Sequence, residues 1–324
     1  MNILYIFGNG FDKALGMATS YPEFYDYLKD KVNGGSVLLQ EMQKEITRDT
    51  ELWADMELGL GKFTSITNNI EEFDAFYFEL SEHLRDYLKY ENDKFTPTTP
   101  LRIKVKEDLT NIHKYIENLD KARFDDFLKP YGNSYKEINV MTLNYTNSFE
   151  KIFNIATNGN NIGLNNAQLR QIIHLHGQLD NSIILGVDNE SQIANEEFRK
   201  IEDIKDCLVK MQSNQAMKET RHVVCKDLID NAHLIVLFGV SLGDTDACWW
   251  KCIGKNLEKR KNLAIIQHLY APEEVPPTQL QKRGRLERKH QQLILQKLAI
   301  EEGNRTDEIK NKLFFTLNKS IFKL

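Results

Sequence analysis

The sequence predicts an α/β protein with a Rossmann-like parallel sheet and a helical insertion. Short apolar runs of strand type stand at residues 2–7 and recur from residue 138 onward. Helical segments separate several of the later runs, and residues 36–128 carry apolar side chains at three- and four-residue spacing. Because strand alternates with helix, we expect parallel strands with helices on both faces of the sheet.

Individual elements follow from local signals. Residues 2–7 (NILYIF) are typical of a buried strand, and Pro22 favours a helix start with Ser20 as its cap. Residues 71–90 (EEFDAFYFELSEHLRDYLKY) have the clearest helical spacing. Later strands are expected at 138–143, 171–177, 182–186, 233–239 and 263–269, and later helices at 146–156, 196–232 and 245–259.

This pattern predicts three parts. Residues 1–35 and 130–270 form the α/β core, and residues 36–129 form a helical insertion or cap between the first two strands. Residues 271–324 form a C-terminal helical extension, which is basic at first and apolar at LFFTL near its end. We see no internal repeat and no low-complexity tract.

Composition narrows the class of protein. A chain of 324 residues that is 41% hydrophobic has ample material for a core, and its net charge of −5 gives no general reason to expect nucleic-acid binding. We expect a cytoplasmic protein, because no apolar run reaches membrane-spanning length and no signal peptide precedes the first strand. Four cysteines (Cys207, Cys225, Cys248 and Cys252) have neither a disulfide framework nor paired zinc spacing, so we expect reduced thiols and no metal.

A glycine turn follows the first strand directly, in the stretch GNGFD at residues 8–12. Ligands of open parallel sheets bind outside the carboxyl ends of the strands. Gly8 and Gly10 would let backbone N–H groups approach a phosphate there. A purely structural turn that needs glycine for its backbone conformation explains the same residues.

Three other predicted strands also end in polar or small residues. Asn144 ends one, His174 and His176 end another, and the stretch FGVSLGDTD (238–246) ends a third. Four such ends at one rim predict a site for a phosphate-bearing ligand. Each has a structural alternative. Asn144 suits a turn, Asp244 or Asp246 suits a helix cap, and one histidine, which we expect to be His174, points to the opposite face.

These motifs resemble a known family. The order GNGFD, S-Y-x-x-F, N-Y-T, H-G-x-L and F-G-x-S-L-x-D-x-D is similar to the abortive-infection AbiH family of bacterial antiphage proteins, and WADMELGL (53–60) fits its W-x-x-x-E stretch. The resemblance runs from residue 3 to about 250. The same landmarks more distantly resemble sirtuin-like NAD-binding domains. In that likeness Gly8 and Gly10 match the phosphate turn, Asn144 the ribose contact and His176 the catalytic histidine.

The resemblance implies a function. Sirtuin deacylases carry a four-cysteine zinc module, which is absent here, and sirtuin-like defence proteins without it resemble NAD glycohydrolases. We therefore expect an antiphage abortive-infection effector that hydrolyses NAD at the nicotinamide–ribose bond without a metal. The implied catalytic residues are His176, Asn144 and Asp12. The implied cofactor-binding residues are Gly8, Asn9, Gly10, Phe11, Gly239, Ser241 and Asp244.

Alternatives from the residues remain open. Asp12 suits a helix cap, and Glu57 either reaches over the site or lies on a solvated helix face. The domain could also bind a nucleotide as a sensor or scaffold without turnover. The basic stretch 282–292 (KRGRLERKHQQ) suits a nucleic-acid groove or a solvated helix face, and no aromatic residues interleave to stack bases. The partners implied are an NAD-like nucleotide and either a second copy of the chain or a partner defence protein. Nucleic acid and membrane are not expected as partners.

Overall fold

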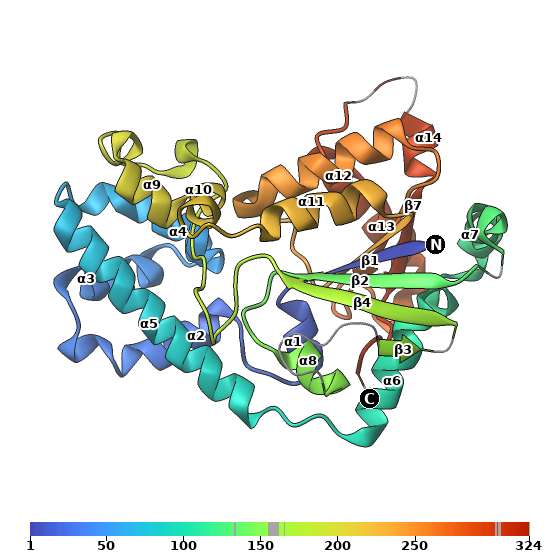
Figure 1. Ribbon diagram of the computed structural model, residues 1–324, viewed down its shortest axis with the longest axis horizontal. Helices are drawn as coiled ribbons and strands as arrows, with labels where there is room; N and C mark the ends of the chain where they lie inside the picture. Colours follow the sequence, from blue (N-terminus) through green and yellow to red (C-terminus); the bar gives the residue numbers. More distant parts are fainter. Residues whose placement is uncertain (133, 155–161, 165, 302, 304–305, 324) are drawn as a thin grey trace.

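The protein has a mixed sheet covered by helices on both faces and a helical lobe beside it (Figure 1). This architecture is seen in a computed structural model, which describes residues 1–132, 134–154, 162–164, 166–301, 303 and 306–323. The α/β class predicted from alternating strand and helix is confirmed.

The described strands form one sheet in the order β3-β4-β2-β1-β5-β6-β7. All neighbours pair in parallel except β3, which pairs antiparallel with β4 at one edge. The strands are β1 (Asn2–Phe7), β2 (Lys136–Thr142), β3 (Ile162–Leu164), β4 (Ala167–His174), β5 (Leu234–Phe238), β6 (Ala264–Leu269) and β7 (Leu313–Leu317).

The described helices fall into the two faces of the sheet and the lobe. They are α1 (Gly10–Ala14), α2 (Tyr21–Lys29), α3 (Val37–Arg48), α4 (Met56–Phe63), α5 (Ile70–Lys94), α6 (Thr99–Thr110), α7 (Asn118–Leu128), α8 (Ser148–Phe153), α9 (Glu202–Leu208), α10 (Lys210–Ala216), α11 (Arg221–Asn231), α12 (Ala247–Lys259), α13 (Arg283–Lys297) and α14 (Thr306–Lys310). The predicted start of α2 is confirmed, because Glu23 accepts from the backbone N–H of Ser20 at 2.9 Å. Residues 155 and 156 of the expected helix 146–156 lie outside the described residues.

Alternate residues of the central strands bury the two faces of the sheet. On one face Leu4 and Ile6 of β1 pack with helices α11, α12 and α13. On the other face Tyr5 and Phe7 pack with α6, α7 and α8. The sheet is therefore buried on both sides, as its unbroken apolar strands predict.

The lobe has its own apolar core. Helices α2 to α5 pack with α9, Val209 and the segment 183–193 around Trp53, Phe73 and Phe76. The segment 36–129 is thus divided by its packing. Its first part lies in the lobe, whereas α6 and α7 cover the sheet. Conversely, α9 and α10 join the lobe although they follow the third parallel strand.

Three expectations about strands need correction. The run 182–186 is no strand of the sheet, because Ile183 and Leu185 pack into the core of the lobe. The strand expected at 171–177 is β4, which ends at His174 and leaves His176 in the following turn. The extension 271–324 is not helical throughout, since residues 313–317 form β7 and pair with β6. None of the helices in the described ranges is long and apolar enough to cross a membrane.

Candidate functional site

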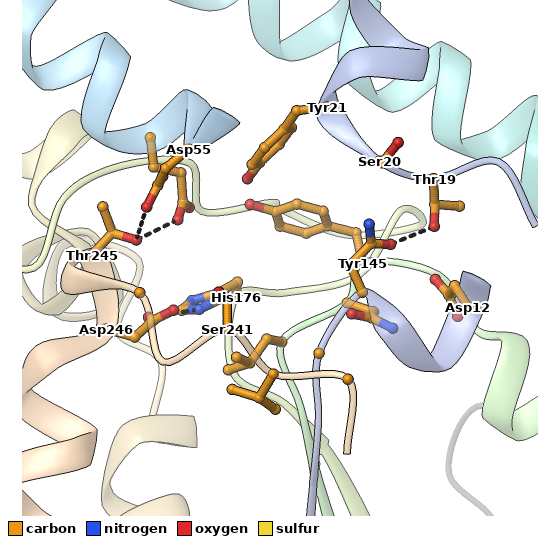
Figure 2. Close-up of a pocket in the computed structure, with 18 of the residues that line it drawn as sticks. Asp12, Thr19, Ser20, Tyr21, Asp55, Tyr145, His176, Ser241, Thr245 and Asp246 are labelled. Carbon is orange, nitrogen blue, oxygen red and sulfur yellow. Dashed lines mark hydrogen bonds and ion pairs between the residues drawn. The ribbon is translucent and has the colours of Figure 1, made fainter. Parts of the chain in front are cut away.

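A cleft opens where the carboxyl ends of the central strands face the lobe. It holds about 310 Å³ and is lined by residues that follow β1, β2, β4 and β5, together with residues of α2 and α4. Figure 2 shows this cleft, in which we distinguish two ends. The glycine-turn end comprises Gly8, Asn9, Asp12, Asn144 and Thr146, and the acidic end comprises Asp55, Glu57, Thr245 and Asp246.

The glycines at this rim hold two loops together. Gly8 donates its N–H to Phe238 O at 3.1 Å, and Gly10 donates to Gly239 O at 3.0 Å. A Cβ on Gly10 would stand 2.4 Å from Gly239 Cα, and Gly239 itself has φ +66°. These glycines therefore allow the loops after β1 and β5 to touch through their backbones, which is a structural requirement in its own right.

Asp12 is fixed at the glycine-turn end by neutral donors. Its carboxylate accepts from Thr146 Oγ1 and from Ser148 Oγ, both at 2.6 Å, and it is 1% exposed. Burial raises the pKa of Asp12, against the hydrogen bonds of Ser148 and Thr146, which lower it. Asp12 lies inside α1, so it does not cap that helix. Its contacts tie α1 to the loop after β2.

Asn144 presents an unused donor in the same cleft. Its carbonyl is bonded to His174 Nδ1 at 2.9 Å, and its backbone N–H donates to Thr142 Oγ1. Its side-chain Nδ2 is buried and makes no hydrogen bond of normal geometry in the described part of the protein, although it lies close enough to Asp12 to lower the pKa of that carboxyl group. Since an unpaired buried donor is costly, this amide is a candidate ligand contact.

The two histidines of the HLHG motif have different surroundings. His174 is fully engaged, since its Nε2 lies 2.7 Å from Glu150 Oε1 and its Nδ1 contacts the Asn144 carbonyl. His176 lines the cleft, with Nε2 3.0 Å from Asp246 Oδ1 but without hydrogen-bond alignment. Its Nδ1 has no partner among the described residues. The sequence expectation that His174 is structural agrees with these contacts.

A buried ion cluster supports the acidic end from behind. Lys210, at the start of α10, donates to Glu57 Oε2 at 2.7 Å and to Asp246 Oδ1 at 3.0 Å. Burial opposes ionisation of Asp246, but Lys210 and His176 outweigh it and hold the pKa of Asp246 below its usual range. Burial also raises the pKa of Glu57, and here the pull of Lys210 only partly offsets it. Lys210 thus joins the lobe to the loop after β5.

Hydroxyl and aromatic groups complete the acidic end. Thr245 Oγ1 lies 3.1 Å from Glu57 Oε2 and 3.5 Å from Asp55 Oδ2. Asp55 also caps α4 through Leu58 N–H at 3.1 Å. Tyr21 and Tyr145 lie beside these groups (Figure 2), and the Tyr145 hydroxyl donates to Ile184 O at 2.8 Å.

The structure brings most of the residues singled out in the sequence into the cleft. Gly8, Asn9, Asp12, Asn144, His176, Gly239 and Ser241 line it. Gly10 lies behind Gly239, and Phe11 is buried in the core against Phe7, at 4.4 Å between ring centroids. Asp244 is exposed and pairs with Lys297. These three do not line the cleft.

Sequence reasoning missed several residues of the site. Lys210, Asp55, Thr245 and Tyr21 were not singled out as site residues. Tyr145 and Asp246 stand at strand ends that were expected to converge on the site, but neither was given a role there, and Asp246 was also weighed as a helix cap. Asp246 does occupy the N-cap position of α12, but its side chain makes no cap hydrogen bond and turns to Lys210 instead. The available signal was the position of Glu57 and Asp55 in the motif stretch 53–60.

No metal centre is apparent in the ranges that the structure describes, since no group of three or more His, Cys, Asp or Glu could hold an ion there. Cys248 and Cys252 are half-buried free thiols on α12. Burial raises the pKa of Cys252 and, together with Asp188, that of Cys248. Raised pKa values leave less of each thiol in the reactive thiolate form at neutral pH.

Comparison with known proteins bears on the whole of this region. No curated protein matches the chain. A protein-family model does match, over residues 4–268, which include the sheet from β1 to β6, the lobe and every residue of the cleft. That model describes bacteriophage abortive infection proteins. The chain belongs to the bacteriophage abortive infection AbiH family.

Proposed function

We propose that the protein is an abortive-infection effector that hydrolyses NAD at the nicotinamide–ribose bond. The observation that carries this proposal is the state of His176. The residue is 4% exposed, one ring nitrogen lies 3.0 Å from Asp246 Oδ1, and the other has no partner among the described residues. A histidine that lines the cleft beside a carboxylate and keeps an unpaired ring nitrogen suits a general base.

The topology supports a dinucleotide in this cleft. Counted along the chain, the six parallel strands have the order 3-2-1-4-5-6, which is that of dinucleotide-binding sheets. The order reverses between β1 and β5, where Gly8 and Gly239 meet. Ligands of such sheets bind at this reversal, and the sirtuin-like arrangement predicted from the motifs is one version of it.

The residues suggest a sequence of events. A water oxygen attacks C1′ of the ribose, His176 accepts the water proton, and the bond to nicotinamide breaks with its electrons going to the ring nitrogen. The leaving group departs neutral because that nitrogen begins as a cation. The transition state resembles the oxocarbenium ion of glycoside cleavage. Asn144 Nδ2 would hold a ribose hydroxyl. Asp12 would contact a ribose or stabilise the positive charge on it rather than move a proton, because hydroxyl groups of Thr146 and Ser148 already hold its carboxyl group in place.

Purified protein incubated with NAD, NADP and ATP provides the test, with products identified by mass. We expect nicotinamide and ADP-ribose from NAD. His176→Ala should lower the rate by about a hundredfold or more, as removal of a positioned base commonly does. His290→Ala, on α13 and outside the cleft, should match the unaltered protein. Constant NAD in phage-challenged cells whose protection survives His176→Ala would overturn the proposal.

A second candidate is a nucleotide sensor without turnover. The observation that favours it is the Lys210 cluster, which joins the lobe to the loop after β5 behind the cleft, so that a ligand in the cleft would alter the contact between lobe and sheet. A sensor would keep ligand affinity and antiphage protection in His176→Ala while releasing no product.

A further inference from the structure

The acidic end of the cleft has an unusual charge for a nucleotide site. Four carboxylates, those of Asp12, Asp55, Glu57 and Asp246, line the cleft, and no lysine or arginine does so among the described residues. Lys210 stands behind two of them and neutralises one charge. Negative charge therefore remains in excess at the acidic end, on the side of His176.

Independent observations point to a ligand here. His176 Nδ1 is a buried polar atom without a partner among the described residues, and His176 lines the cleft beside Asp246. Asp55 Oδ2, Thr245 Oγ1 and Ser241 Oγ all lie within 3.8 Å of the point where a Cβ on Gly243 would stand. The three oxygens thus converge on one small region of the cleft, although Ser241 itself is exposed.

We propose that the acidic end is a subsite for a positively charged aromatic ring, so that the cleft selects the oxidised pyridinium form of a nicotinamide nucleotide over its reduced form. This inference rests on the function proposed above and names its substrate class. Carboxylates favour the cation, and the rings of Tyr21 and Tyr145 offer faces for cation–π contact. The glycine-turn end is left for the remainder of the nucleotide.

The charge also has a kinetic consequence. The ring is cationic in the substrate and neutral in the released nicotinamide. An acidic subsite therefore holds the substrate more tightly than the product, and the positive charge that develops on the ribose stays beside Asp246 and Glu57. The carboxylates that attract the cationic ring of the substrate exert no such attraction on the neutral product, so they do not slow its release.

Binding can be measured apart from turnover. The probe is a carbocyclic NAD⁺ analogue, in which a methylene group replaces the ribose ring oxygen and prevents cleavage, compared with its dihydropyridine form. Calorimetry on the full chain should give about tenfold tighter binding of the oxidised form, since one unit charge near these carboxylates is only partly screened. Asp55→Asn should reduce that preference by about threefold or more.

Asp49→Asn is the matched control. Asp49 also accepts from a backbone N–H at the start of a short helix, Leu52 N at 2.9 Å, but it is exposed and does not line the cleft. Asparagine caps helices as well as aspartate, so both variants should keep the fold. The control should retain the full preference for the oxidised form.

The outcomes separate this inference from the proposed function. Equal affinity for the two redox forms, or a preference that Asp55→Asn leaves unchanged, overturns the charged subsite even if NAD is hydrolysed. A preference for the oxidised analogue, combined with no product when NAD itself is the substrate, supports the subsite and rejects hydrolysis. Failure to bind either form rejects both.

Discussion

The two ends of the cleft hold buried carboxylates in different ways. At the glycine-turn end, Asp12 accepts from two hydroxyls, and burial raises its pKa. At the acidic end, Asp246 contacts Lys210 and His176, which hold its pKa below the usual range against the effect of burial. Neutral donors fix where a carboxyl group lies, whereas a cationic partner also keeps it ionised.

The ends differ in their origin as well. The glycine-turn end is built from loops of the sheet, after β1, β2 and β5. The acidic end combines Glu57 of α4 and Lys210 of α10, both in the lobe, with Asp246 after β5. Substitutions at the glycine-turn end should therefore destabilise the sheet. Substitutions at the acidic end should weaken the contact between the lobe and the sheet as well.

The largest effect is expected from Gly239→Ala at the glycine-turn end. The new Cβ would stand 2.5 Å from Gly10 Cα and 2.6 Å from Phe11 N, which are backbone atoms with little freedom to move. With the added strain of φ +66°, we expect a loss of about 4 kcal/mol in the free energy of unfolding.

Gly16→Ala is the control for this change. Gly16 has φ +82°, and a Cβ there would meet no atom within 4 Å. It should cost about 1 kcal/mol from backbone strain alone. Urea unfolding measures both variants, and equal losses would show that the contact between the loops after β1 and β5 contributes nothing.

At the acidic end, Lys210→Met should cost about 3 kcal/mol at pH 7, because it leaves Glu57 and Asp246 buried without their cation. The pKa values of both carboxyl groups then rise in the folded state, so the folded protein binds protons more tightly than the unfolded chain. The loss should therefore shrink as the pH is lowered toward 4.5.

Lys200→Met removes an exposed ion pair with Glu197 and should change stability by less than about 0.5 kcal/mol. Thermal unfolding at both pH values checks the pair of variants. A loss in Lys210→Met that is the same at pH 7 and pH 4.5 would contradict the charge argument.

The same contrast explains what the sequence could predict. The glycine-turn end comes from strand ends, and strands β1, β2, β5 and β6 are visible as apolar runs. The rule that ligands gather at carboxyl ends then points to Gly8, Asn144 and His176. Lys210 looks like a residue of a solvated helix, and only the packing of α10 against α4 and the loop after β5 buries it.

Apolar runs alone also misassigned two segments. Residues 182–186 and 313–317 are both short and largely apolar, yet the first packs into the lobe and the second forms β7. A short buried run has no periodicity that separates these outcomes. The structure of such a run depends on the element that packs against it. Ile183 and Leu185 pack with helices α2 to α5 of the lobe, which lie far away in the sequence.

The two histidines offer a smaller and cleaner comparison. His174→Ala removes the contacts with Asn144 O and Glu150 and should cost about 2 kcal/mol. His176→Ala removes one poorly aligned contact with Asp246, which keeps Lys210, and should cost less than about 1 kcal/mol. Urea unfolding of the two variants decides the matter, and a larger loss for His176→Ala would mean that His176 serves the fold.

The last substitution, Asp12→Asn, tests whether neutral donors leave a carboxyl group costly to ionise. Asparagine keeps one acceptor oxygen for Thr146 or Ser148, so we expect a change of about 1 kcal/mol at pH 7. The pKa of Asp12 is raised in the folded state, so its contribution to stability is full below its unfolded pKa of about 3.9 and declines as the pH rises through the folded value. The stability of the unaltered protein relative to Asp12→Asn should therefore fall between pH 3 and pH 7. Asp26→Asn, at an exposed ion pair, should show no such fall. A difference that rises with pH would mean that Asp12, like Asp246, is stabilised as an anion.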